Sequence, residues 1–105
     1  MDDKEIEDEI KRKNLNAPRV KLNDLHDKIK NVEICKFITT SGQVLRWAIL
    51  TMENGFAVVG EASCSVSSEN DDQELGENIA IKNSHSKVWE LEGYALKQKL
   101  FEQGN

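Results

Sequence analysis

This sequence is short of the residues that mark several familiar classes of protein. It has one proline, two cysteines and an aromatic content of 6% in 105 residues. Two cysteines without CxxC spacing indicate neither a disulfide framework nor a zinc site. No apolar run approaches the roughly 20 residues of a membrane-spanning helix, and residues 1–20 lack the apolar core of a signal peptide. We therefore expect a protein that stays in a reducing cytosol and does not bind membranes.

Basic residues are too few for general binding to nucleic acid. The chain has 14 Lys and Arg against 19 Asp and Glu, a net charge of −5, whereas affinity for phosphate backbones comes from basic side chains that displace counterions. We predict no direct binding to nucleic acid. The acidic excess is compatible with a weak mimic of DNA, although solubility explains it more simply.

The usual constellations of catalytic residues are missing as well. An enzyme needs a nucleophile beside a base, paired carboxylates in a pocket, or metal ligands. His26 and His85 are isolated in the sequence, and Cys35 and Cys64 fall in apolar runs, where we expect buried free thiols. The sequence therefore predicts a protein without catalytic activity, cofactor or bound metal.

What the sequence does contain is a strong hairpin signal at residues 47–60, WAILTMENGFAVVG. Asn54-Gly55 can adopt the positive φ that a two-residue type I′ turn needs at both central positions. Such a turn opposes Leu50 to Val59. The hairpin is the best-defined local structure that the sequence predicts.

A second turn precedes this hairpin. Residues 33–40, EICKFITT, have the β-branched and aromatic composition of a strand, and Ser41-Gly42 provides a turn into the next strand. The prediction is a three-stranded antiparallel meander with apolar side chains on both faces, so that both faces require cover. The two registers place Trp47, Val58, Ile34 and Ile38 on one face and Leu50, Val59, Cys35 and Phe37 on the other.

Two short helices are predicted before the meander. Residues 2–14 are acidic first and basic last, which suits the dipole of a helix, and Pro18 interrupts the pattern. We interpret residues 1–17 as an acidic helical or mobile arm that precedes one domain at residues 18–105. In the second helix, Asn23 is the predicted N-cap, and one side carries Leu22, Leu25, Ile29 and Val32.

A long helix is predicted from about Asp71 to about Phe101. No proline interrupts these residues, and the predicted length is about 45 Å. Asn70 and Gln73 have capping-box spacing at its start. Small residues recur at every fourth position, which permits close approach of the sheet or of another helix: Gly76, Ala80 and Ser84. The predicted fold is α+β, a three-stranded antiparallel meander with short N-terminal helices and one long C-terminal helix.

The second part of this helix is bulky and apolar, and it is longer than one small sheet can cover. Either the helix bends at Gly93 and folds back on the meander, or another subunit covers it. We predict a homo-oligomer, most simply a dimer of two-fold symmetry. The predicted interface consists of Trp89, Leu96, Leu100 and Phe101.

One group of polar and aromatic residues is a candidate for binding a partner or ligand. The predicted register brings Arg46 and Glu61 diagonally together, either as an ion pair or as a pair that contacts a ligand. A small anion such as a nucleotide would bind near Arg46 and Trp47, beside the helix N-terminus at Asn70.

Several short motifs of this chain are distinctive: Asn54-Gly55-Phe56, Val59-Gly60-Glu61, Gly76 with Ala80, and Trp89 followed by Glu92-Gly93-Tyr94. With these motifs the chain resembles a small family of uncharacterised bacteriophage proteins, with members in phages of the Sf-six and N-four types. The resemblance covers roughly residues 18–100.

This resemblance implies a non-structural accessory protein that is made in the bacterial host and acts by binding a host factor, in host takeover or in anti-defence. The alternatives are a sponge that binds a small nucleotide-like ligand and a weak acidic DNA mimic. The family itself implies no enzymatic activity.

Overall fold

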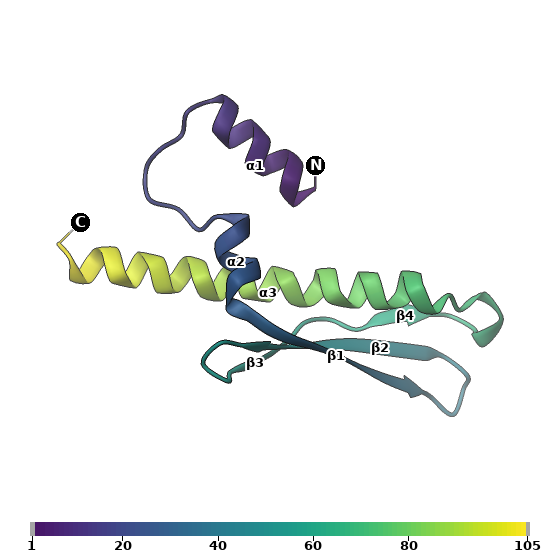
Figure 1. Ribbon diagram of the computed structural model, residues 1–105. Coiled ribbons are helices and arrows are strands. Elements are labelled where there is room, and N and C mark those ends of the chain that lie inside the picture. The colour runs from purple at the N-terminus through teal and green to yellow at the C-terminus, as the bar shows by residue number, and fades with distance from the viewer. Residues whose placement is uncertain (1, 105) are drawn as a thin grey trace.

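The computed structural model describes residues 2–104 and shows an antiparallel sheet with a long helix along one face (Figure 1). The α+β class is therefore confirmed, with four strands in the sheet instead of three. In chain order the elements are α1 (Asp3–Arg12), α2 (Leu22–Lys28), β1 (Ile29–Ile38), β2 (Val44–Met52), β3 (Ala57–Val59), β4 (Ser63–Ser65), the 3-10 turn η1 (Ser68–Asn70) and α3 (Gln73–Glu102).

Strand β2 lies at the centre of the sheet. It pairs with β1 along one side and with β3 and then β4 along the other. The fourth strand arises because the chain after β3 continues beside β2 until Cys64 lies opposite Leu45. Every second residue of β2 is buried, and these residues face α3.

The turn at Asn54-Gly55 is longer than predicted, and the register therefore differs by one residue. The N–H of Met52 donates to the carbonyl of Phe56 at 2.9 Å, and only Gly55 has a positive φ, +88°. The connection is thus a three-residue loop that ends in a glycine bulge. Leu50 consequently pairs with Val58, and the predicted pairing with Val59 is wrong.

The first hairpin has the same kind of loop. The N–H of Thr39 donates to the carbonyl of Gln43 at 2.9 Å, and Gly42 has a φ of +91°. A shift of one residue moves every side chain to the other face, so the predicted faces of β1 are reversed. The face toward α3 carries Ile34, Ile38, Ala48, Leu50 and Val58, and the other face carries Cys35, Phe37, Leu45, Trp47, Ile49 and Val59.

The two thiols were predicted to be buried, and this is wrong. Cys35 and Cys64 are free and exposed. Cys35 lies opposite Trp47, and Cys64 lies opposite Leu45. Both thiols are therefore on the face that α3 does not cover.

Helix α2 ends earlier than the spacing of its apolar residues suggested. Its last residue is Lys28, and β1 begins at Ile29. Val32, which was predicted to lie on this helix, pairs with Leu50 in the sheet. Helix and strand periods coincide over a few residues, and pairing with β2 decided between them.

Helix α3 runs without interruption from Gln73 to Glu102. Its N-cap is Asp72, whose carboxylate accepts from the N–H of Leu75 at 2.9 Å, so the predicted capping box at Asn70 is not formed. The helix is continuous through Gly93, and the alternative of a bend there is wrong.

The small residues of α3 lie against the sheet, as predicted. Ala80 and Ser84 are fully buried. Gly60 lies so close to the helix that a Cβ atom on it would be 2.4 Å from the carbonyl oxygen of Asn83. The N–H of Gly60 donates to Ser84 Oγ at 2.9 Å, and Ser84 Oγ donates to the carbonyl of Ala48 at 2.6 Å. The Ser84 hydroxyl therefore joins helix and sheet at their closest contact.

The core lies beside this contact and is small. It consists of Leu25, Leu50, Met52, Val58 and Val88, with Leu22, Ile29 and Trp89 packed against it. Within the described residues, no helix is both long and apolar enough to cross a membrane.

Candidate functional site

Arg46, the first candidate residue, is buried between the sheet and the start of α3. Its guanidinium donates to both carboxylate oxygens of Asp71, at 2.6 and 2.7 Å, and Gly76 leaves room for it. The hydrogen bonds from Arg46 lower the pKa of Asp71 to about 2. Arg46 therefore does not pair with Glu61 as we had expected, and its charge is already neutralised.

The remaining candidate residues are not brought together. Trp47 is half-buried on the opposite face of the sheet from Arg46, because consecutive residues of a strand point to opposite faces. Glu61 and Asn70 are exposed, Glu61 after β3 and Asn70 at the end of η1. Arg46 and Asn70 do line one small cavity of about 80 Å³ at the start of α3. Trp47 lies on the other face of the sheet, so the predicted group of Arg46, Trp47 and Asn70 is not formed as one cluster.

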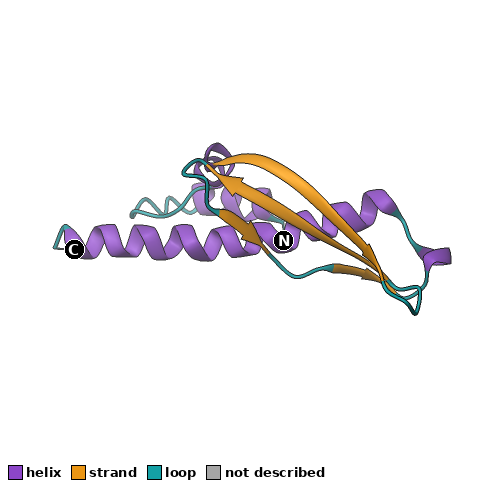
Figure 2. Ribbon diagram, turned by 90° about the horizontal axis from the view of Figure 1, so that it is seen from below, coloured by secondary structure: helices purple, strands orange, loops and turns teal. Residues whose placement is uncertain are grey.

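Trp47 belongs instead to an apolar surface that we call the outer face. In Figure 2 the sheet lies in front of α3 and no other element covers it. Phe37 is 59% exposed and Val59 47% exposed. The outer face consists of Cys35 and Phe37 of β1, Leu45, Trp47 and Ile49 of β2, Val59 of β3 and Cys64 of β4. Such a continuous apolar surface is typical of an interaction site.

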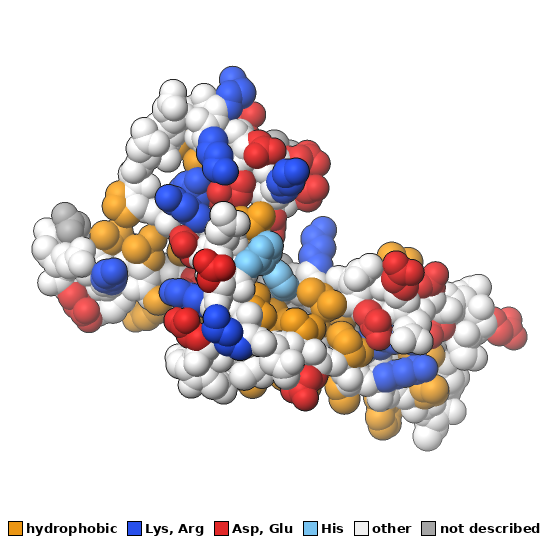
Figure 3. Space-filling model, viewed as in Figure 1, with side chains coloured by type: hydrophobic (Ala, Val, Ile, Leu, Met, Phe, Trp, Pro, Cys, Tyr) orange, Lys and Arg blue, Asp and Glu red, His pale blue; other side chains and the backbone are white. Residues whose placement is uncertain are grey.

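A second candidate surface lies on the other side of the molecule, where α1 and α2 meet α3. A cleft of about 440 Å³ is present there, which we call the histidine cleft. The rings of His26 and His85 lie edge to face with their centroids 5.9 Å apart, and Figure 3 shows the histidine side chains (pale blue) together at the surface. The lining also includes Lys4, Lys82, Ser86 and Trp89.

The environment of the histidine cleft keeps one imidazole neutral. Burial lowers the pKa of His85, and the neighbouring His26 lowers it further, while Asp3 opposes the shift. His85 is therefore uncharged at neutral pH and is able to donate or accept a hydrogen bond. Lys4 and Lys82 line the cleft together with Asp2 and Asp3, so side chains of both charges surround it.

Helix α1 forms one wall of this cleft and is attached to the rest of the chain at two points. The indole N–H of Trp89 donates to the carboxylate of Asp3 at 3.2 Å. Glu7 is buried, receives a hydrogen bond from Arg19 at 2.7 Å, and also accepts from the N–H of Leu22. The acidic side chains of α1 thus make contacts within their own chain.

The residues predicted to form an oligomer interface have different surroundings. Trp89 packs against the core of its own subunit. Leu96 and Leu100 are half-buried, and Leu96 lines a cleft with Arg19 and Val20. Phe101 is 71% exposed. The C-terminal part of α3 extends beyond the sheet (Figures 1 and 2). We call residues 91–102 the projecting half, although its first turn still lies beside the β2–β3 hairpin, where Leu91 and Ala95 line a cleft with Met52 and Phe56.

These surfaces have the chemistry of binding. The tryptophan ring of the histidine cleft suits an aromatic ligand, and its lysines suit an anionic group on the side away from Asp2 and Asp3. The outer face suits an apolar partner. Cys35 and Cys64 lie on the opposite side of the sheet from the helices that carry the histidines. Among residues 2–104, no three or more His, Cys, Asp or Glu side chains are grouped so as to hold a metal ion.

Comparison with families of known proteins assigns the chain to one of them. The model of the phage protein family named for N4 Gp49 and phage Sf6 gene 66 matches residues 3–100. The chain belongs to this family. No curated protein and no solved structure matches it. Membership of this phage family, which the resemblance had suggested, is thus confirmed over almost the whole chain.

Sequence reasoning did not find the most specific contacts of this family member. Asp71, the partner of Arg46, was assigned only to the start of a helix, and its spacing from Arg46 contains no signal. His26 and His85 were judged separately, because nothing local indicates that α2 crosses α3 at His85. The close approach at Gly60 was detectable in part, since a glycine inside a strand pattern often marks close backbone contact.

Proposed function

We propose that this phage protein acts in the infected bacterium by binding a host protein, in host takeover or anti-defence, and that it does not act as an enzyme. The observation that carries the proposal is the outer face, an apolar sheet surface that the chain leaves uncovered. Soluble monomers rarely expose large contiguous apolar patches unless these bind something.

Two details of the outer face support recognition of a protein. Trp47 lies on its central strand, and tryptophan is among the residues that most often dominate binding energy at interfaces. Phe37 is a second aromatic side chain and is already 59% exposed. Glu33 lies opposite Ile49 on the same face and adds a charged side chain beside the apolar ones, and apolar centres with polar surroundings are the usual anatomy of interfaces.

The test is capture of host proteins by wild type and by variants of the outer face. Phe37→Glu and Trp47→Glu should lose a host protein that wild type retains, and the purified host protein should then bind wild type at least about 100-fold more tightly than Phe37→Glu. Val66→Glu is the matched control, because Val66 is 90% exposed and lies outside the outer face. Equal binding by Phe37→Glu, Trp47→Glu and Val66→Glu would reject the outer face as the recognition surface.

The second candidate function is a sponge for a small nucleotide-like ligand, and the histidine cleft favours it. Its volume of about 440 Å³ lies within the usual range of small-molecule pockets, about 300–1,000 Å³. Lys4 and Lys82 would meet phosphate, and Trp89 offers an aromatic ring. The buried Arg46 would not take part, because Asp71 already occupies its guanidinium.

A thermal-shift assay against nucleoside mono-, di- and triphosphates and dinucleotides tests this candidate. A true ligand should raise the Tm of wild type and raise it less in Lys82→Ala. Lys30→Ala is the control, because Lys30 is an exposed lysine on β1 outside the cleft. If a ligand raises the Tm of Lys82→Ala and Lys30→Ala equally, it binds outside the histidine cleft.

A further inference from the structure

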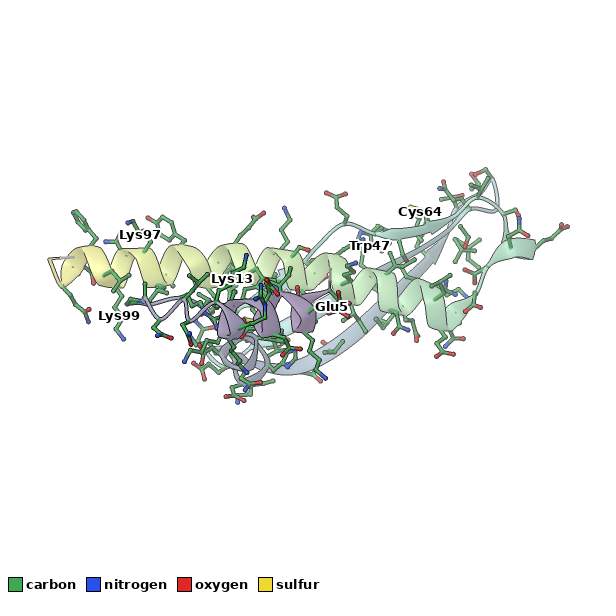
Figure 4. All side chains as sticks on the ribbon, turned by 90° about the horizontal axis from the view of Figure 1, so that it is seen from above. Glu5, Lys13, Trp47, Cys64, Lys97 and Lys99 are labelled. Carbon is green, nitrogen blue, oxygen red and sulfur yellow. The ribbon has the colours of Figure 1, made fainter. Side chains whose placement is uncertain are left out.

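The projecting half of α3 has more exposed apolar surface than its subunit can cover. Leu91 is 44% exposed, Tyr94 73% and Phe101 71%. Figure 4 shows no other element beside the projecting half on the side to which Lys97 points. This part of the helix is as well formed as the part that rests on the sheet. Its packing comes from Leu91 and Ala95 beside the β2–β3 hairpin, from the Lys28–Glu92 ion pair and from Leu96 beside Val20, whereas Tyr94 and Phe101 stay largely exposed.

The size of the exposed surface indicates how large a missing partner is. The chain exposes 7591 Å², whereas a compact monomer of 11.9 kDa exposes about 6,000 Å². The excess of about 1,600 Å² exceeds the roughly 800 Å² that each partner buries in a standard interface. The radius of gyration, 16.7 Å, is likewise above the roughly 13 Å of a compact chain of this length.

The exposed apolar side chains of the projecting half lie on one stripe of the helix. Leu91, Tyr94, Gln98 and Phe101 are separated by three, four and three residues, which is the spacing of a coiled-coil seam. Glu90 and Lys97 both lie along the same flank of this seam, seven residues apart, and both are exposed. Neither belongs to an ion pair among residues 2–104.

We infer that a second copy of this chain covers this seam and forms an antiparallel helix pair with it. In a pair related by a two-fold axis beside Tyr94, the two helices run in opposite directions. The flank that carries Glu90 and Lys97 then lies against the same flank of the second copy. Glu90 then faces Lys97 of the second copy, and Lys97 faces Glu90. Phe101 meets the aliphatic stem and ammonium group of Lys87 of the second copy, an arrangement that favours a cation–π contact. The seam is thus complementary to itself in both shape and charge.

This inference revises which residues hold the predicted dimer together. Phe101 stays in the interface, and Leu91 and Tyr94 join it. Trp89 leaves it, because its ring packs on its own core and its indole N–H is bonded to Asp3. Leu96 and Leu100 lie toward the opposite flank of the helix and are half-buried, and Leu96 lies beside the loop that carries Val20.

A charge exchange tests the inference directly. Glu90→Lys alone and Lys97→Glu alone each place two pairs of like charges across the axis, and each should weaken the dimer by about tenfold. The double variant exchanges the two charges and should restore wild-type dimerisation. Glu69→Lys changes an exposed acidic residue of η1; it makes the same change in net charge as Glu90→Lys and should have little effect.

Sedimentation equilibrium over a range of concentrations measures these dissociation constants, and far-UV circular dichroism checks folding. Tyr94→Glu should weaken the dimer by more than about 100-fold while the subunit stays folded, because Tyr94 is largely exposed. If wild type has the mass of a monomer at about 100 μM, the inference is overturned. A dimer that resists Tyr94→Glu but dissociates in Phe37→Glu would overturn it too, since the outer face would then be the interface. These outcomes do not depend on whether a host protein binds.

Discussion

The two halves of α3 have the same secondary structure and opposite surroundings. The first half rests on the sheet through Ala80, Ser84 and Val88, which are all fully buried. The projecting half leaves Tyr94 and Phe101 more than two-thirds exposed. Both halves are helical, and their burial depends on where the sheet ends. The first half, which we call the anchored half, joins the helix to the sheet, and the projecting half leaves apolar side chains exposed.

Substitution of Gly60 is expected to have the largest effect on the anchored half. In Gly60→Ala the new Cβ atom would lie 2.4 Å from the carbonyl oxygen of Asn83. Helix and strand would have to separate, since backbone atoms cannot move aside as a flexible side chain can. We expect the free energy of unfolding, measured with urea, to fall by more than about 3 kcal/mol. A change below about 1 kcal/mol would show that the contact at Gly60 is not close.

Loss of the carboxylate of Asp71 should have the second-largest effect on stability. Asp71→Asn leaves the guanidinium of the buried Arg46 without its counter-charge. We expect Tm at pH 7 to fall by about 10 °C or more. Glu69→Gln, a nearby exposed residue, is the matched control and should leave Tm unchanged.

The ion pair of Arg46 and Asp71 also predicts how the stability of the protein changes with pH. Because the folded-state pKa of Asp71 is lowered from 3.8 to about 2, its contribution to stability is complete above pH 3.8 and is lost as pH falls through 2. Wild type should therefore lose stability between about pH 4 and pH 2 more steeply than Asp71→Asn does. If the curves of stability against pH run parallel for wild type and Asp71→Asn, the ion pair does not contribute as described.

Removal of the Ser84 hydroxyl is expected to have a smaller effect. Ser84→Ala leaves the N–H of Gly60 and the carbonyl of Ala48 without their side-chain partner. We expect the free energy of unfolding to fall by about 2 kcal/mol. Ser86→Ala is the control, since Ser86 is exposed and bonds only within its own helix. If both substitutions cost the same, the hydroxyl of Ser84 does not join helix to sheet.

The smallest expected effect lies in the projecting half and has the opposite sign. Nothing lies within 4 Å of a Cβ atom built on Gly93, and glycine within a helix is less stable than alanine by roughly 0.5–1 kcal/mol. Gly93→Ala should therefore raise the free energy of unfolding by about that amount, as measured with urea. Destabilisation instead would mean that Gly93 is in close contact with a partner helix.

Much of the fold could be predicted from the sequence because its signals are local. The absence of proline from residues 71–101 predicts an uninterrupted helix, and acidic residues before it predict where it begins. The glycines of Ser41-Gly42 and Asn54-Gly55 predict two turns, and both turns are present. The length of each loop was wrong by one residue, because a glycine at the end of a three-residue loop has the same sequence signature as one in a two-residue turn.

The candidate sites were less predictable, because they depend on contacts between distant parts of the chain. The assignment of Arg46 to a surface pair failed when the chain after β4 brought Asp71 over it. The pairing of His26 with His85 required α2 to cross α3. Conversely, the resemblance to a phage family needed only short motifs, and the family match over residues 3–100 confirmed it.

The sequence by itself determined most of the segments that are helix or strand, since periodicity and turn residues act over a few neighbouring residues. The exceptions are residues 29–32, which pairing with β2 made strand, and the fourth strand β4. It also determined the family. The tertiary structure decided the register of the hairpins and therefore which side chains face α3. It decided as well that Arg46 is buried and neutralised, that two histidines meet in one cleft, and that Trp47 lies on an uncovered face. The physical reason is that register and burial depend on the free energy of packing the whole sheet against α3, to which residues from both ends of the chain contribute.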